Sequence, residues 1–132
     1  MTHFLDTNIC IYHLNGSAPG LSAILEQTPP SSIGIPSMVA AELIFSAEKS
    51  VKREHNLKRI ELFLSLYDII PFESKAAQIY GAIRCNLERR GRIIGGNDLI
   101  IAATVLAHEG ILVTNNTEEF SRINGLRLED WM

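Results

Sequence analysis

The chain has 132 residues, of which 46% are hydrophobic and 20% are charged, a composition typical of one globular domain spanning residues 1–132. Its formal net charge of -3 excludes the class of proteins that coat nucleic acid through a general basic excess. Any contact with RNA or DNA would therefore need a local basic patch or bridging cations.

Short apolar segments alternate along the chain with longer segments of helical periodicity. In chain order, strands are expected at residues 3–6, 32–36, 68–72 and 111–114, with a weak fifth at 126–128. Helices are expected at residues 9–14, 18–27, 37–47, 57–66, 74–90 and 98–106, the last of them capped by Asn97. This alternation predicts an α/β fold, a single domain in which a central parallel sheet of four to five strands is flanked by helices on both faces.

The cysteines and the apolar segments indicate the cellular location of the protein. Cys10 and Cys85 are too few for a disulfide scaffold and match no zinc motif, so we expect them to be free thiols. Asp6 interrupts the N-terminal apolar run, and no apolar stretch approaches the ~20 residues that cross a bilayer. We therefore expect a cytoplasmic protein without a membrane contact.

Acidic residues gather where the predicted strands end. Asp6 ends the first strand, Glu42 lies one to two turns into the helix after the second, and Asp98 lies in the first turn of the most apolar helix. Asn115, Asn116, Glu118 and Glu119 directly follow the fourth strand. In a parallel sheet, ligands bind beyond the carboxyl ends of the strands, so these groups are expected to converge on one edge.

Each acid also has an ordinary structural interpretation. Asp98 suits the positive end of a helix dipole, and Glu42 could pair with a lysine or face solvent. Asp6 taken alone could equally be a helix cap or a ligand. The coincidence of all three at the predicted edge favours a shared site.

Carboxylates packed together repel one another, and they remain ionised only when a cation lies between them. A site with oxygen ligands alone favours Mg²⁺ or Mn²⁺. Such ions activate water and stabilise the leaving oxygen of a phosphodiester. The acidic residues therefore indicate metal-assisted hydrolysis of a phosphate ester.

Basic side chains precede this site in the sequence. Arg84, Arg89, Arg90 and Arg92 are either a solvated helix face or a basic rim that contacts an RNA backbone. The four histidines show no spacing typical of metal ligands, so we interpret them as structural.

At these residues the sequence resembles the PIN-domain ribonuclease toxins of VapBC toxin–antitoxin modules. The matching stretches are FLDTNI at residues 4–9, VAAEL at 39–43, GNDLIIAA at 96–103 and LVTNNTEEF at 112–120, followed by GLRLEDW at 125–131. The resemblance spans the whole chain, with the motifs in order and at family-like spacing.

The resemblance implies a role for individual residues. Asp6, Glu42 and Asp98 match the three near-invariant metal-binding acids of the family, and Glu119 matches a fourth that precedes an aromatic residue. Asn116 stands where other members place an aspartate, which leaves the fourth ligand open between these two positions. Asn8 and Thr114 match polar positions that line the site and support the acids.

The resemblance also implies an activity and partners. Such toxins are Mg²⁺- or Mn²⁺-dependent endoribonucleases that block translation, and the most similar branch cleaves tRNA, usually initiator tRNA in the anticodon loop. They form homodimers and higher toxin–antitoxin assemblies, and a VapB antitoxin neutralises them by covering an apolar groove. The helices at residues 9–14 and 57–66 could supply that groove, although their apolar faces also suit an ordinary core.

Two other functions remain to be compared with this one. A phosphatase of the haloacid dehalogenase type would use Asp6 as a nucleophile, but it needs a second aspartate at the position of Asn8 and a lysine near Asp98. A catalytically inactive interaction domain is disfavoured because crowded carboxylates cost stability when nothing uses them.

Overall fold

The computed structural model describes residues 2–132, and it has at its centre a five-stranded sheet whose paired strands are all parallel. The strands lie in the order β3-β2-β1-β4-β5. The elements are β1 (His3–Leu5), α1 (Thr7–Asn15), α2 (Pro19–Gln27), a 3₁₀ turn (Pro30–Ser32), β2 (Ile33–Pro36), α3 (Ser37–Glu48), α4 (Arg53–Leu64), β3 (Asp68–Ile70), α5 (Ser74–Arg89), α6 (Gly96–Ala107), β4 (Ile111–Val113), α7 (Thr117–Phe120) and β5 (Arg127–Glu129). The predicted α/β class and parallel sheet are thus confirmed.

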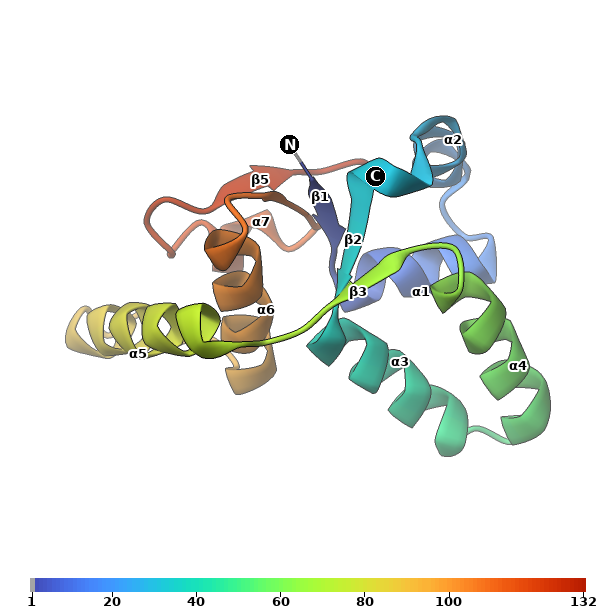
Figure 1. The fold of residues 1–132 in the computed structure, drawn as a ribbon, viewed down its shortest axis with the longest axis horizontal. Helices are drawn as coiled ribbons and strands as arrows, with labels where there is room; N and C mark the ends of the chain where they lie inside the picture. Colours follow the sequence, from blue (N-terminus) through green and yellow to red (C-terminus); the bar gives the residue numbers. More distant parts are fainter. Residues whose placement is uncertain (1) are drawn as a thin grey trace.

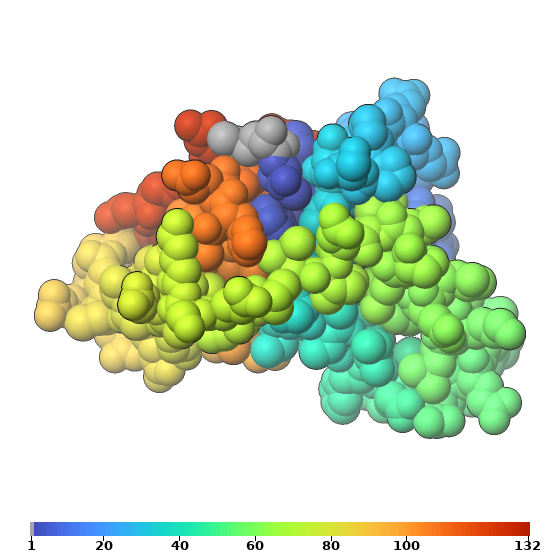
Figure 2. All heavy atoms as spheres, viewed as in Figure 1, coloured from blue at the N-terminus to red at the C-terminus, as the bar shows by residue number. Residues whose placement is uncertain are grey.

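Helices cover both faces of this sheet, as the sequence predicts. Helices α1, α3 and α4 gather on one side of the strands, and α5 and α6 pack against each other on the other side (Figure 1). The space-filling view shows two projecting ends, one formed by α5 and the other by the α3–α4 hairpin (Figure 2). The strands lie between these two ends, and the segments that follow β1, β2 and β4 contain the candidate site residues.

The central strands are buried on both faces, which is why they read as apolar runs in the sequence. All four residues of β2 are buried, whereas the edge strand β3 exposes Asp68 and Ile69. Phe4, on β1, lies between the neighbouring strands and is only 1% exposed. Leu112 and Val113 continue this core on β4.

Helix α1 begins directly after β1 because Asp6 is its N-cap. The Asp6 carboxylate accepts a hydrogen bond from the backbone N–H of Ile9 at 2.9 Å, which satisfies one of the free donors of the first turn. Gly16 ends the helix in the left-handed region, with a φ of 71° that favours glycine. Strand β1 therefore ends at Leu5, one residue earlier than expected.

Several predicted boundaries are corrected by the structure. Asn97 does not cap α6: the helix begins at Gly96 with Gly95 as its cap, so the Asn97 amide is free for a tertiary contact. The helix expected at residues 57–66 runs from Arg53 to Leu64 instead. The third strand ends at Ile70, before Pro71, which has no N–H to donate to a sheet. The short helix α7 was not predicted.

Both cysteines are free, as expected, with Cys10 buried and Cys85 exposed. Within residues 2–132, no helix combines the length and the apolar character needed to cross a membrane.

Close packing around Phe4 makes Gly34 sensitive to substitution. A Cβ atom at Gly34 would lie 2.8 Å from Phe4 Cε1 and 3.2 Å from Ile70 Cγ1. We expect Gly34→Ala to lower the free energy of unfolding by about 1–3 kcal/mol, because the buried ring must shift. Gly81→Ala is the matched control: it lies inside α5 with nothing within 4 Å, so it should raise stability by about 0.5–1 kcal/mol. Urea unfolding measures both, and wild-type stability in Gly34→Ala would contradict the prediction.

Candidate active site

Four carboxylates lie at the carboxyl edge of the sheet, and one of them, Asp98, is within electrostatic range of the other three. Asp6 follows β1, Glu42 lies in α3 after β2, and Glu119 lies in α7 after β4. Asp98, in the first turn of α6, is repelled by the other three. The order of the sheet places β1 between β2 and β4, so segments far apart in sequence deliver their acids to one place.

Asp6 is the most buried member of this group, with 5% of its surface exposed. One carboxylate oxygen accepts the Ile9 N–H, and the other accepts a hydrogen bond from the hydroxyl of Thr114, which is fully buried. Burial raises the pKa of Asp6, and these hydrogen bonds act in the opposite direction. Asp6 is therefore a helix cap and a member of the acidic cluster at the same time.

Glu42 is half-buried and is held by two neutral donors. The hydroxyl of Thr7 donates to its Oε1 at 2.5 Å, and the amide of Asn97 donates to its Oε2 at 3.3 Å. Thr7 and Asn97 are site residues that the sequence did not predict. The available signal was their position, because each is the direct neighbour of a site acid, Asp6 or Asp98.

Asp98 and Glu119 interact directly through their charges and a hydrogen bond. Burial and the charge of Glu119 raise the pKa of Asp98 to about 7, so that Asp98 can donate a hydrogen bond to Glu119. Glu119 itself accepts from the amide of Asn116 at 2.9 Å and from the Gly95 N–H at 3.4 Å. The Asn116 contact is the main reason that the pKa of Glu119 is lowered. Asn116 thus orients the neighbouring acid through its amide.

All four side chains offer carboxylate oxygens, the ligands that hard divalent cations prefer. None of the four carboxylates forms an ion pair with a basic side chain within residues 2–132, although the nearby charge of Arg122 helps to lower the pKa of Glu119. In the same part of the chain no three acidic, cysteine or histidine side chains stand close enough to enclose one ion. Glu42 and Glu119 are turned toward neutral donors, and small rotations of these two side chains would be needed to share a cation. Oxygen ligands with unneutralised charge fit Mg²⁺ or Mn²⁺.

The remaining predicted residues lie around this cluster. Asn8 is exposed in the first turn of α1. Arg84 is engaged by Glu88 and Tyr80, and Arg90 by Asn86 and the carbonyl of Arg122. Arg89 and Arg92 are exposed, and their side chains make no hydrogen bond or ion pair within the described residues. Of the four arginines, these two have guanidinium groups available to another molecule.

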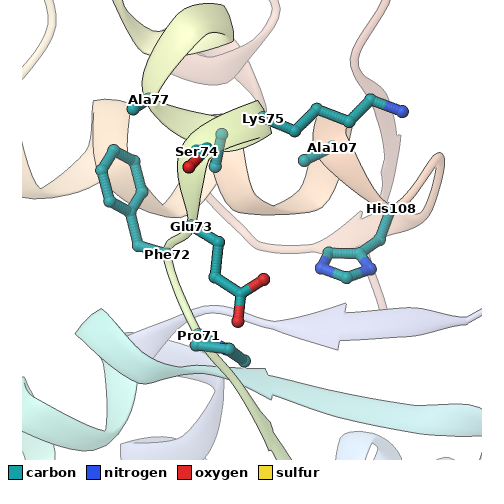
Figure 3. A pocket seen from close by; sticks show the side chains of 9 residues that line it. Pro71, Phe72, Glu73, Ser74, Lys75, Ala77, Ala107 and His108 are labelled. Atoms are coloured by element: carbon teal, nitrogen blue, oxygen red, sulfur yellow. The ribbon is translucent and has the colours of Figure 1, made fainter.

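A hollow of about 700 Å³ lies elsewhere on the surface, at the far end of α6. It is lined on one side by the β3–α5 connection and the first turn of α5, which include Glu73 and Lys75, and on the other side by Ala107 and His108 (Figure 3). Asp98 and Ala107 are separated by ~14 Å along the helix axis. The acidic cluster therefore lies outside this hollow.

Comparison with known proteins gives consistent matches along nearly the whole chain. The PIN domain family model matches residues 3–126. Ribonuclease VapC2 of Rickettsia felis is 44% identical over 132 residues, covering 99% of this chain and 98% of the relative. The tRNA(fMet)-specific endonuclease VapC of Shigella flexneri is 41% identical over 127 residues, covering 96% of each chain. A crystal structure of VapBC2 from Rickettsia felis bound to a promoter DNA fragment aligns over 100% of both chains with a TM-score of 0.94 and 43% identity.

Burial of Asp98 and repulsion from the neighbouring acids predict a pH-dependent gain in stability when its charge is removed. The folded-state pKa of about 7 lies above the ordinary value of 3.8, so the folded protein binds the extra proton and loses stability as pH rises through this interval. Asp98→Asn should therefore stabilise the metal-free protein by about 1–2 kcal/mol at pH 8, after allowance for solvent screening, and leave it unchanged at pH 3.5.

Urea unfolding at several pH values measures this effect. Glu118→Gln is the control, because Glu118 is 80% exposed in the same short helix as Glu119 and should show no such pH dependence. A loss of stability in Asp98→Asn at pH 8 would show that the repulsion is not the dominant interaction of Asp98.

Proposed function

This chain belongs to the VapC branch of the PIN-domain family, and from that membership we propose that it is the toxin of a type II toxin–antitoxin module. Its proposed activity is a Mg²⁺- or Mn²⁺-dependent endoribonuclease that inhibits translation by cleaving tRNA. The observation that supports this best is the cluster of four carboxylates, which neutral donors orient and which form no ion pair with a basic side chain within the described residues.

Asp6, Glu42, Asp98 and Glu119 are the residues proposed to hold the metal. Bound cations of this kind lower the pKa of an attacking water and stabilise the leaving oxygen of the phosphodiester. The chain's own contribution is orientation. Burial and two hydrogen bonds fix Asp6, whereas Glu42 and Glu119 are more exposed and can rotate from their present donors.

A proton on the Asp98–Glu119 pair has to leave when a cation binds. The pKa of Asp98, about 7 in the absence of metal, places that proton loss near neutral pH. Binding should therefore strengthen as pH rises from 6 to 8, because less work is needed to ionise the pair. Before a cation binds, the hydrogen bonds from Thr7 and Asn97 hold Glu42 at the carboxyl edge of the sheet.

Initiator tRNA is the proposed substrate, cut in its anticodon loop. The support comes from the relatives of Shigella flexneri and Salmonella typhimurium, which are 41% and 37% identical to this chain and are called tRNA(fMet)-specific endonucleases. With a net charge of -3, the chain cannot attract tRNA through its overall field. The bound cations and the exposed Arg89 and Arg92 are proposed to supply the positive charge.

A VapB-type antitoxin is the proposed partner, and the similar Rickettsia felis protein was crystallised as VapBC2. A hollow of about 180 Å³ lies between α1, α3 and α4, lined in part by Ile11, Leu14 and Ile60. Ile11 and Leu14 lie in α1 and Ile60 lies in α4, the two helices that the sequence suggested as a groove. Helix α3 also lines this hollow. The homodimer and the cytoplasmic location stay predictions.

Loss of one cluster acid should abolish activity without unfolding the protein. We expect Asp6→Asn and Glu119→Gln to reduce metal-dependent cleavage of initiator tRNA about 100-fold or more, since each removes a charge that holds the cation. Glu118→Gln, one residue from Glu119 and 80% exposed, should cleave at the wild-type rate. EDTA should stop the wild-type reaction, and an elongator tRNA should be left intact. Growth inhibition by Asp6→Asn equal to that of the wild type would contradict the proposal.

Filling the groove between α1, α3 and α4 should separate toxicity from neutralisation. Asn15 is exposed, lines this hollow and ends α1, ~14 Å along the helix from Asp6, so Asn15→Trp should exclude an antitoxin side chain while leaving the acids in place. We expect the variant to keep its ribonuclease activity but to remain toxic when co-expressed with its cognate VapB-type antitoxin. Ala23→Trp, on the exposed face of α2, controls for the added indole. Full neutralisation of Asn15→Trp would place the antitoxin on another surface.

A further inference from the structure

Two arginines join the α5–α6 connection to the segment that follows α7. Arg122 Nη1 donates a hydrogen bond to the carbonyl oxygen of Ile93 at 2.9 Å. In the other direction, Arg90 Nη2 donates to the carbonyl oxygen of Arg122. The two segments, 29 residues apart in sequence, are therefore bound by reciprocal contacts between side chain and backbone.

These two segments directly adjoin the helices α6 and α7, which carry half of the acidic cluster. The α5–α6 connection ends at Gly95, whose N–H donates to Glu119 Oε1 at 3.4 Å, and α6 then begins and presents Asp98. Glu119 lies three residues before Arg122, in a helix of only four residues. A helix this short has no stability of its own, so its position depends on tertiary contacts. Phe120 and Ile123 are buried and anchor it on one side.

Among the contacts that tie this short helix to the Asp98 segment, that of Arg122 uses a largely buried side chain, which is only 23% exposed. The guanidinium also pairs with Glu118, which is 80% exposed and 3.3 Å away, so that ion pair is largely screened by solvent. The hydrogen bond to the Ile93 carbonyl is therefore the interaction of Arg122 with the greater structural consequence. The Arg122 charge also acts on Glu119 and lowers its pKa. Loss of that charge alone would favour cation binding, the opposite of the effect that loss of positioning would have.

We propose that Arg122 is a positioning residue that holds Glu119 opposite Asp98 by binding the Ile93 carbonyl, and so sets the affinity of the acidic cluster for a divalent cation. The proposal rests on the metal-dependent function proposed above. Residues that orient metal ligands typically change metal affinity 10–100-fold when they are substituted. Arg122 acts one contact further away, and the effect expected here is about tenfold.

Three variants of the full chain test this role. Arg122→Met keeps the apolar stem and removes the guanidinium, whereas Arg122→Lys keeps one charged donor for the Ile93 carbonyl. Glu118→Gln removes only the exposed ion pair. Calorimetric titration with Mn²⁺ alone should give a dissociation constant about tenfold higher in Arg122→Met, partly restored in Arg122→Lys and unchanged in Glu118→Gln. In cleavage assays, the half-maximal Mn²⁺ concentration should rise in the same order while the KM for RNA stays constant.

A lower thermal stability in Arg122→Met with wild-type Mn²⁺ affinity would overturn the proposal, because it would assign Arg122 a purely structural role. If Arg122→Met does not fold, the comparison of Arg122→Lys with wild type decides, and equal Mn²⁺ affinity overturns the proposal in the same way. Failure of the proposed function looks different: wild-type protein would then neither bind Mn²⁺ nor cleave RNA.

Discussion

Mutual repulsion among the carboxylates at the carboxyl edge of the sheet is the constraint on which the rest of the site depends. The fold brings four acids together and gives each one a neutral hydrogen-bond donor or a neighbouring acid, never a lysine or arginine within the described residues. A salt bridge would relieve the repulsion, but it would also cancel the charge that attracts a cation. Hydroxyl and amide donors such as Thr114 and Asn116 orient the acids and leave that charge in place. Burial and this repulsion together raise the pKa of Asp98 to about 7, so that without metal it holds a proton near neutral pH.

The negative cluster must nevertheless act on a negative substrate. The net charge of -3 gives no long-range attraction for RNA, so attraction has to be local. Two of the arginines that precede α6 are occupied by intramolecular contacts: Arg84 binds Glu88, and Arg90 binds the backbone of Arg122. Their role in the folded chain is to stabilise α5 and the connection to α6. Arg89 and Arg92 keep their charge exposed. One run of arginines in the sequence therefore serves two purposes, which a charge count alone cannot distinguish.

The sheet and the position of the acids follow from the sequence for a simple reason. Parallel strands that are buried on both faces are apolar runs, and their carboxyl ends share one edge, so Asp6 and Glu119 can be placed from strand positions alone. The contacts of Thr7 and Asn97 with Glu42 could not be placed, because they join residues 35 and 55 positions apart through a single hydrogen bond each. Such pairs leave no periodic signal. Helix α7 was missed because four residues are too few for helical periodicity to show. Asn97 was assigned as a cap because the sequence favours it there, and the tertiary contact with Glu42 uses its amide instead.

The two interpretations of Asp6, as a helix cap and as a ligand, are compatible because its two oxygens do different things. Oδ1 caps α1 through the Ile9 N–H, and Oδ2 accepts from the Thr114 hydroxyl. An asparagine at this position can keep the cap with its remaining oxygen, while its amide donates to Thr114 Oγ1, which already accepts the N–H of Asn116 at 3.0 Å. The hydroxyl of Thr114 then loses its acceptor but keeps its place. Charge and structure are therefore separable at Asp6, and this is why an asparagine there reports on chemistry, whereas an alanine would also remove the cap of α1.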